Sequence, residues 1–278
     1  MTGVPPRSDH ATVSALLSGA GFIAADEEAE ELLAAAGDDA TLLDALVERR
    51  LTGEPLAWIT GHVPFCGVDV HVDPGVYVPR WHTEGLARRA VERLQVDGIA
   101  VDLCTGSGAI AKVLATARPG ALVVAADIDE RAVACARRNG VEAFAGDLFE
   151  PLPSGLEGRV DVVVAVVPYV PSAELPLLQR DTFTFESPLS YDGGPDGAGV
   201  LRRTLRDSPR FLRRGGTLLL ELGGDQADLL GDDLEALGYT RAGVLRDEEG
   251  DVRGVEATFG AATTTAERPR RGGRPPRA

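Results

Sequence analysis

A glycine-rich turn in the middle of the chain has the residue types needed to hold a nucleotide-like ligand. The apolar run 101–103 leads through Thr105 into Gly106 and Gly108, and an apolar helical pattern follows from Ala111. The two glycines let the backbone bend tightly and approach a ligand without a Cβ in the way. Their spacing also satisfies a dinucleotide fingerprint, so the turn alone does not identify the ligand.

Three aspartates lie at positions suited to the parts of an adenosyl ligand. Asp102 lies in the strand before the turn, where a carboxylate repels a pyrophosphate but attracts a methionyl ammonium group. Asp127 ends the next strand and can accept hydrogen bonds from both ribose hydroxyls, and Asp147 can receive the adenine amino group. In this order they favour S-adenosylmethionine (SAM) over NAD. Taken singly, each residue also has a structural interpretation. Asp102 could be a buried, hydrogen-bonded residue of a strand, and Asp147 could be the N-cap of a helix.

Alternating strand and helix patterns must position these residues. Strand patterns cover residues 99–103, 122–127, 142–144, 160–166 and 217–222. Helix patterns cover residues 84–94, 109–117, 130–139, 198–212 and 227–237. Paired strands over 240–246 and 254–259 close the unit. The repeated units predict an α/β fold with a mostly parallel sheet and helices on both faces.

The residues ahead of this unit form a different pattern. Leucines recur at helical spacing over residues 11–50 and predict a small bundle, which either only packs or acts as a lid over a substrate. Residues 64–79 alternate, with a turn at 73–75 leading into 76–78, and predict a β-hairpin. The predicted divisions are a helical domain (1–62), a hairpin linker (63–80), a catalytic domain (81–260) and a disordered Arg-rich tail (261–278).

The composition limits the classes of partner. The 278 residues carry a formal net charge of −15, which repels phosphate backbones, argues against nucleic acid and favours a cationic or neutral substrate. No apolar run approaches the roughly 18 residues of a spanning helix. The N-terminus has no basic-then-apolar signal, so a cytoplasmic protein without membrane contact is predicted. Three unpaired cysteines predict free thiols rather than disulfides or a zinc site. The oligomeric state is not predicted.

Further motifs make the chain resemble the HemK/PrmC family, the protein N5-glutamine methyltransferases, over residues 43–259. Upstream, these motifs are Leu51-Thr52-Gly53-Glu54-Pro55-Leu56, Phe65-Cys66-Gly67 and Val78-Pro79-Arg80-x-x-Thr83-Glu84. Downstream, they are Gly146-Asp147-Leu148-Phe149, Leu189-x-x-Asp192-Gly193-Gly194-x-Asp196-Gly197 and Leu220-Glu221-Leu222-Gly223-x-x-Gln226. The resemblance implies a Rossmann-like, seven-stranded SAM-dependent methyltransferase core behind a small helical domain and a β-hairpin linker.

Motifs and resemblance together define a predicted site. The predicted SAM contacts are Asp102, Thr105, Gly106, Gly108, Asp127, Ile128, Asp147, Leu148 and Val166. The predicted acceptor contacts are Phe65, Arg80, Tyr169 and Glu186, and the predicted catalytic residues are Val166, Pro168, Tyr169 and Glu186. No metal is predicted.

The segment Val166-Val167-Pro168-Tyr169 departs from the family's acceptor motif, Asn-Pro-Pro-Tyr. In the family, the Asn amide accepts a hydrogen bond from the target nitrogen and helps to align its lone pair with the methyl group. The Tyr ring packs beside the acceptor and the sulfonium. Val166 keeps the strand but cannot accept a hydrogen bond, a loss of about 1–3 kcal/mol with a glutamine acceptor.

A guanidine or amine needs this alignment less, provided that a carboxylate binds the cation or removes a proton. The loop beyond Tyr169 offers Glu174, Asp181 and Glu186, which otherwise belong to a solvated acidic loop. Glu186 is preferred because it adjoins the 189–197 motif, which is expected to fold over the site.

Other side chains leave alternatives open. His82 could serve as a base, although an incidental position is favoured, and Glu221 is expected to brace a neighbouring loop. Trp58, Trp81 and Tyr77 could line an acceptor pocket or pack the hairpin.

Three functions follow from these observations. The preferred one is N-methylation of a small cationic acceptor, such as a free amino acid with a guanidine or amine. The alternative is methylation of a glutamine in a peptide chain release factor. The least favoured is a non-catalytic SAM-binding protein.

Overall fold

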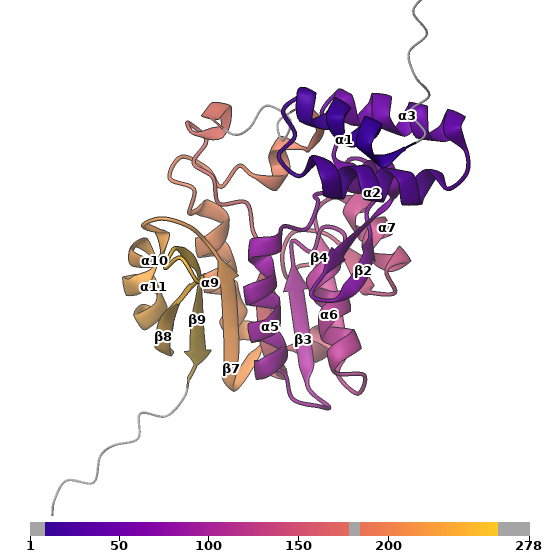
Figure 1. Cartoon of the computed structure of the whole chain (residues 1–278). Coiled ribbons are helices and arrows are strands. Elements are labelled where there is room, and N and C mark those ends of the chain that lie inside the picture. Colours follow the sequence, from indigo (N-terminus) through magenta and orange to yellow (C-terminus); the bar gives the residue numbers. More distant parts are fainter. Residues whose placement is uncertain (1–8, 178–183, 261–278) are drawn as a thin grey trace, which may run out of the picture.

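The computed structural model describes residues 9–177 and 184–260, an α/β core preceded by helices and a hairpin (Figure 1). The helices are α1 (His10–Gly19), α2 (Ala25–Ala36), α3 (Ala40–Leu51), α4 (Leu56–Thr60), α5 (Glu84–Arg93), α6 (Ala109–Ala117), α7 (Glu130–Arg138), α9 (Gly199–Phe211), α10 (Gln226–Leu229) and α11 (Gly231–Ala236). The strands are β1 (His62–Phe65), β2 (Val68–His71), β3 (Ile99–Leu103), β4 (Leu122–Asp127), β5 (Glu142–Ala145), β6 (Val160–Ala165), β7 (Leu212–Glu221), β8 (Tyr239–Arg246) and β9 (Val252–Phe259). Short 3₁₀ helices are η1 (Trp81–Thr83), η2 (Ser154–Leu156), η3 (Leu175–Leu177) and η4 (Pro188–Ser190).

Seven strands form one mainly parallel sheet in the order β5-β4-β3-β6-β7-β9-β8. Only β9 runs antiparallel to its neighbours, β7 and β8. The predicted Rossmann-like α/β fold with an antiparallel edge is therefore confirmed. The chain passes from β3 to β4 on one side and reaches β6 on the other, so a crevice opens at the carboxyl ends of these strands.

Alternate side chains of the central strands enter apolar clusters on opposite faces of the sheet. Ala100 and Val162 pack in a cluster that includes residues of α5, α6, α7 and the hairpin. Val101 and Val163 pack in a second cluster with residues of α9 and α11. Each fully buried aliphatic side chain contributes about 1.5–3 kcal/mol. Burial on both faces explains why these strands read as continuous apolar runs.

The N-terminal helices pack around a third apolar cluster, which includes Val13, Leu17, Leu32 and Val47. Figure 1 shows α1, α2 and α3 together at one end of the molecule, beyond β2. Among the described helices, none has the length and apolar character needed to cross a bilayer. The arrangement agrees with the predicted bundle, whereas the predicted domain boundaries and the cytoplasmic location stay predictions. The predicted disordered tail falls outside the described residues.

The hairpin is present, but its predicted turn was wrong. Strand β2 pairs with β1 across a turn at Cys66 and Gly67, rather than with residues 76–78 across 73–75. The backbone at Cys66 and Gly67 has φ values of 48° and 77°. Two positive φ values in a two-residue turn match the twist of a hairpin, and glycine accepts them without strain. Residues 76–78 instead run along the crevice.

Two further element boundaries differ from the prediction. Strand β7 begins at Leu212, five residues before the predicted start, because Leu212 pairs with Val160 ahead of a register shift near Gly216. The predicted helix 227–237 is divided into α10 and α11 at Leu230, which is fully buried. In both places tertiary packing overrides the local pattern.

Candidate active site

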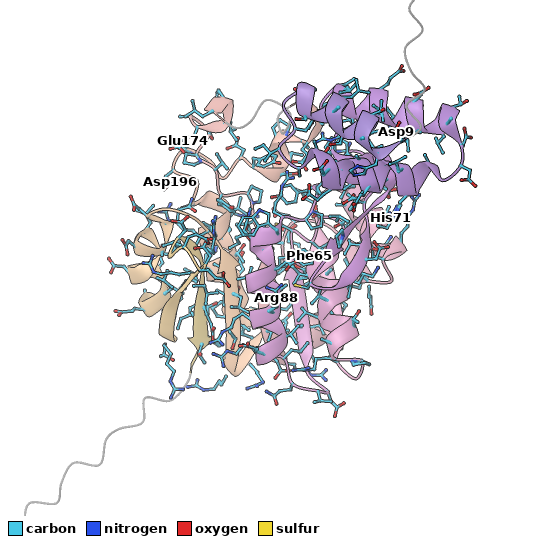
Figure 2. All side chains as sticks on the ribbon, in the orientation of Figure 1. Asp9, Phe65, His71, Arg88, Glu174 and Asp196 are labelled. Carbon is cyan, nitrogen blue, oxygen red and sulfur yellow. The ribbon has the colours of Figure 1, made fainter. Side chains whose placement is uncertain are left out.

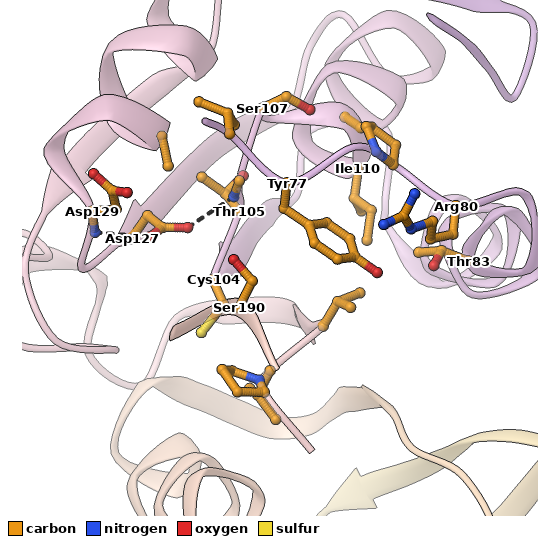
Figure 3. A pocket seen from close by; sticks show the side chains of 18 of the residues that line it. Tyr77, Arg80, Thr83, Cys104, Thr105, Ser107, Ile110, Asp127, Asp129 and Ser190 are labelled. Carbon is orange, nitrogen blue, oxygen red and sulfur yellow. Dashed lines mark hydrogen bonds between the residues drawn. The ribbon is translucent and has the colours of Figure 1, made fainter. Parts of the chain in front are cut away.

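A cavity of about 680 Å³ lies at the carboxyl ends of β3, β4 and β6. Its volume falls in the usual range for small-molecule sites. Figure 3 shows Asp127 and Asp129 on one side, Arg80 and Thr83 on the other, and Tyr77 between them. The glycine turn and the 166–170 segment also line the cavity. Parallel strands thus bring the two halves of the predicted site to a single crevice.

Asp102 anchors the glycine turn. Its Oδ2 accepts hydrogen bonds from Thr105 Oγ1 at 2.6 Å and from the Ala111 N–H at 3.1 Å, and the side chain also lines the cavity. Burial is the main cause that raises the pKa of Asp102 to about 7. The carboxylate therefore fixes the turn and can meet a ligand's ammonium group, so the two roles considered from the sequence are compatible.

The two glycines of the turn serve different needs. Gly108 has φ 82°, and a Cβ there would lie 2.9 Å from Ala136 Cβ on α7, so this position packs the turn against a helix. Gly106 has φ 55°, and a Cβ there would come no closer than 3.9 Å to Tyr77. A side chain at Gly106 would therefore enter space that the cavity offers to a ligand. This cradle fits the methionyl part of SAM.

Asp127 presents its carboxylate at the end of β4. Its Oδ2 accepts the Gly106 N–H and its Oδ1 accepts the Asp129 N–H, each at 2.9 Å. Burial raises the pKa of Asp127. Asp127 lines the cavity, and each oxygen can accept a further hydrogen bond, as pairing with two ribose hydroxyls requires. Ile128, which is 63% exposed, lines the same wall.

Asp147 and Leu148 lie beyond this wall and are not among the cavity-lining residues. The Asp147 carboxylate pairs with the Arg203 guanidinium of α9, which the sequence did not suggest. Leu148 has φ 50° and is buried. Contact of Asp147 with the adenine ring stays a prediction, and the partly exposed ion pair would have to open or share its carboxylate.

The acceptor end of the cavity is formed by the segment that follows β6. Val166, Pro168 and Tyr169 all line the cavity, with Val166 half-buried. The Tyr169 hydroxyl donates to Glu221 Oε1 at 3.2 Å, and Gln226 Nε2 donates to the Tyr169 carbonyl at 2.7 Å. Tyr169 is thus held at its hydroxyl and at its backbone carbonyl, and Val166 contributes an aliphatic side chain to the same end.

Glu186 lies behind this end of the cavity rather than in its wall. Its carboxylate accepts hydrogen bonds from Arg80 Nη2 at 2.5 Å, from the Val78 N–H at 3.0 Å and from the Tyr191 hydroxyl. The Glu186 side chain is 1% exposed. The Arg80 guanidinium compensates the charge of Glu186, and both of its carboxylate oxygens already accept hydrogen bonds. The predicted role as a free acceptor-binding or catalytic carboxylate has no geometric support, and the residue instead clamps the 185–191 segment to the 78–80 segment.

The other two carboxylates of the loop do not replace it. Glu174 is exposed, and Figure 2 shows it on an outer loop away from Phe65, a cavity-lining residue that is itself 1% exposed. Asp181 falls outside the described residues. No carboxylate in the described part of the chain therefore projects freely into the acceptor end.

The aromatic residues left open by the sequence separate into two groups. Trp58 is buried and donates from Nε1 to the Val76 carbonyl at 2.9 Å, so it packs the chain behind the cavity. Tyr77 and Trp81 line the cavity, and Trp81 is 72% exposed at its rim. The Arg80 guanidinium lies 4.9 Å from the centre of the Tyr77 ring.

Asn139 helps to hold the cavity together, although no motif in the sequence marks it. Its Oδ1 accepts the His71 N–H at 2.9 Å, and its Nδ2 donates to the carbonyls of His71 and Ser107 at 2.8 Å each. One side chain therefore joins the hairpin to the glycine turn. Asn139 looks like an ordinary helix end in the sequence, because its partners lie far away along the chain.

A group of His71, Asp73 and Cys135 brings ligand-type atoms within 4.8 Å of one another near the hairpin. Asp73 Oδ1 already binds Arg138 Nη1 at 2.6 Å. Burial raises the pKa of Cys135 to about 11. The paired carboxylate joins Asp73 to α7, and the absence of a metal stays a prediction.

Comparison with known proteins identifies the family of this chain. The model of the family "Methyltransferase small domain" matches residues 68–169. A release factor glutamine methyltransferase of Geobacter sulfurreducens is 36% identical over 221 residues, which cover 77% of each chain. One of Moorella thermoacetica is 40% identical over 218 residues, covering 74% of this chain and 76% of that protein.

A relative with another printed substrate is also similar. The 4-amino-L-phenylalanine/4-methylamino-L-phenylalanine methyltransferase of Streptomyces pristinaespiralis is 37% identical over 191 residues, which cover 65% of each chain. These relatives are named as enzymes, so the expectation of a non-catalytic binding protein is set aside. The chain belongs to the HemK/PrmC family of release factor glutamine methyltransferases, and it is a SAM-dependent methyltransferase.

Proposed function

We propose that this enzyme methylates the side-chain amide nitrogen of a glutamine in a protein, with a peptide chain release factor as the acceptor. One observation carries the proposal: the carboxylate expected to bind a cation, Glu186, is already paired with Arg80. The carboxylates that do line the cavity are Asp102, Asp127 and Asp129, all at the cofactor end. An acceptor end with no carboxylate in its wall suits a neutral nitrogen better than a guanidinium or ammonium group.

The space behind Arg80 supports an extended acceptor. A second cavity of about 240 Å³ lies between the N-terminal helices and the core, and Arg80 lines both cavities. Arg50, Pro55 and Val63 contribute to its wall. A peptide with its glutamine in the main cavity could place a flanking residue here. We include in this proposal that residues 1–62 form a helical domain that recognises the acceptor protein.

The chain's own residues have distinct tasks in this reaction. SAM supplies an electrophilic methyl group when it is bound by the glycine turn, Asp102 and Asp127. Tyr169, fixed by Glu221 and Gln226, presents a ring against which a planar amide can pack. Val166 excludes water without offering a hydrogen-bond acceptor, so alignment of the nitrogen depends on its neighbours. Pro168 stiffens the backbone between Val166 and Tyr169.

A second candidate acceptor is the aromatic amine of a free amino acid. The aliphatic Val166 favours it, because an aryl amine is neutral and more nucleophilic than an amide. The relative named 4-amino-L-phenylalanine/4-methylamino-L-phenylalanine methyltransferase gives it a precedent. An aryl amine would also use the neutral acceptor end and the Tyr169 ring.

A Val166→Asn exchange tests the choice. Labelled SAM would be incubated with the wild-type or variant enzyme and with either a release factor or 4-amino-L-phenylalanine. For a glutamine acceptor, the new amide adds one hydrogen bond to the target nitrogen, so kcat/KM should rise about tenfold. A matched Val96→Asn exchange, which adds the same amide at an exposed valine that does not line the cavity, should leave kcat/KM within about threefold.

The opposite result identifies the other acceptor. Labelling of 4-amino-L-phenylalanine by the wild-type enzyme, no labelling of the release factor, and a fall with Val166→Asn would replace the glutamine proposal by the aryl amine one. An absence of label on the release factor and on 4-amino-L-phenylalanine would contradict both proposed acceptors.

A further inference from the structure

A histidine and a buried carboxylate lie together at the acceptor end of the cavity. His82, on η1, lines the cavity, and its Nε2 lies 3.6 Å from Glu221 Oε1 at the end of β7. Thr83 Oγ1 donates to Glu221 Oε2 at 2.6 Å, and the Tyr169 hydroxyl donates to Oε1 at 3.2 Å. The Glu221 side chain is 3% exposed and that of His82 is 24% exposed. Glu221 thus lies in the protein interior, and its partner His82 lies in the cavity wall.

Glu221 is a buried carboxylate with no permanent counter-ion. Within residues 9–177 and 184–260, no arginine or lysine forms an ion pair with it, and its hydrogen-bond donors are two hydroxyl groups. A buried charge is stabilised most by an opposite charge nearby. His82 is the neighbour that can become cationic by taking up a proton. The 3.6 Å separation therefore places Glu221 where it can stabilise a positive charge on the His82 ring.

The other ionisable groups at this end cannot do the same near neutral pH. Arg80 holds its proton permanently and is paired with Glu186. Burial raises the pKa of Tyr77 to about 12 and also raises the pKa values of Tyr169 and Tyr191, so these hydroxyls keep their protons. The neutral His82 imidazole is the cavity-lining side chain among them that has a nitrogen lone pair able to accept a proton.

We propose that His82, supported by Glu221, is the catalytic base that takes the proton released by the acceptor nitrogen on methylation. This inference rests on the proposed N-methylation. The nitrogen lone pair forms the new N–C bond, and the electron pair of the broken C–S bond stays on sulfur. The nitrogen then carries one proton in excess, which passes to the free imidazole nitrogen of His82. Glu221 stabilises the resulting imidazolium, and solvent at the cavity mouth removes the proton afterwards.

The electrostatic surroundings of His82 come from four elements. Glu221 of β7 faces it and is itself hydrogen-bonded by the Tyr169 hydroxyl after β6 and by Thr83 of η1. Trp81 packs against the His82 ring with centroids 5.8 Å apart, and the Arg253 guanidinium of β9 lies 6.0 Å from the Trp81 centroid. Glu221 carries the nearest charge, and a negative charge there stabilises the imidazolium form of His82.

The test compares His82→Asn and Glu221→Gln with His71→Asn, an exchange of a partly exposed hairpin histidine that does not line the cavity. Methyl transfer from labelled SAM to release factor would be measured from pH 6 to 9, SAM affinity by calorimetry, and the His82 ring by NMR titration in the unliganded protein. Wild-type kcat should fall on acidification through the range in which histidines protonate. His82→Asn should lower kcat at pH 8 by about a hundredfold and remove that acid limb, with SAM affinity within about twofold.

The two proposals fail in different ways. An active wild-type enzyme whose kcat and acid limb survive His82→Asn would overturn the role of His82, while glutamine methylation would stand. A wild-type enzyme inactive on release factor would instead contradict the proposed acceptor. In that case the NMR titration still decides about the pair: Glu221→Gln should lower the pH at which the His82 ring titrates, and an unchanged midpoint would overturn the inference. His71→Asn should change neither readout.

Discussion

The cofactor end and the acceptor end of the cavity are held together in different ways. At the cofactor end, Asp102 binds Thr105 and Ala111, three and nine residues away along the chain. At the acceptor end, Glu186 binds Val78 and Arg80, more than a hundred residues away. Local bonds form as soon as the turn forms, whereas distant ones depend on the complete fold. Loss of an acceptor-end contact should therefore affect global stability, and loss of a cofactor-end contact should affect mainly ligand affinity.

The largest effect expected from this comparison is on stability. Arg80→Met leaves the buried Glu186 carboxylate without its counter-charge, which should lower the free energy of unfolding by about 3 kcal/mol. Urea unfolding would measure it. Arg88→Met removes an exposed ion pair with Glu84 and serves as the matched control, with an expected loss below about 1 kcal/mol.

A second exchange checks the cause of that loss. Adding Glu186→Met to Arg80→Met removes the unpaired carboxylate and should recover most of the stability. Equal losses for Arg80→Met and Arg88→Met would show that the clamp contributes no more than a surface ion pair.

At the cofactor end the expected effect is on affinity. Asp127→Ala removes the acceptor of both ribose hydroxyls and the partner of the Gly106 N–H, so SAM affinity should fall about a hundredfold. Calorimetry would measure it, and the change in the free energy of unfolding should stay smaller than for Arg80→Met. Glu130→Gln, an exposed exchange in the first turn of α7, should bind SAM like the wild type. Affinity retained in Asp127→Ala would remove the basis for assigning this end to the cofactor.

The smallest effect expected is a pH dependence from Asp102. Because burial raises the pKa of Asp102 to about 7, acidification from pH 8 to 6 should neutralise the partner of the methionyl ammonium and weaken SAM binding by up to about tenfold. Asp102→Asn should bind more weakly and lose this pH dependence. Calorimetry at several pH values would check both, and an unchanged slope in Asp102→Asn would assign the dependence to another group.

For folding stability, the pH dependence that arises from Asp102 has the opposite sign. The pKa of Asp102 in the folded protein exceeds its ordinary value of 3.8, so its contribution to stability is fully present below pH 3.8 and is lost as pH rises through about 7. Ligand binding and folding thus respond to this one carboxyl group in opposite directions.

The sheet could be predicted from the sequence because its strands are buried on both faces. Residues 99–103 and 122–127 were predicted to the residue as β3 and β4, since an apolar run between a glycine and a turn leaves little choice. The hairpin turn was misplaced because Asp73-Pro74-Gly75 and Cys66-Gly67 are both plausible turn sequences. Pairing of β2 with β1, which residue patterns do not specify, decided between them.

The predicted site residues divide in the same way, into those placed by local sequence order and those placed by contacts between distant segments. The lining of the cofactor end by Asp102, Gly106 and Asp127 could be predicted, because a strand, a turn and a helix in sequence order fix their relative positions. Glu186 was assigned a free carboxylate because its counter-charge, Arg80, lies in another motif. The proximity of His82 to Glu221 had no signal in the sequence at all, since only the placement of η1 beside β7 creates it.

The Asn139 bridge has a consequence for the timing of the reaction. Because one amide holds both the hairpin that carries Phe65 and the turn that carries Gly106, the two walls of the cavity should fluctuate in phase. In-line methyl transfer needs the donor carbon and the acceptor nitrogen about 3–3.5 Å apart, with the nitrogen lone pair aligned with the C–S bond. Correlated motion keeps that separation nearly constant while the walls themselves move. The bridge would thus govern how often a bound pair reaches a reactive geometry, rather than how tightly either ligand binds.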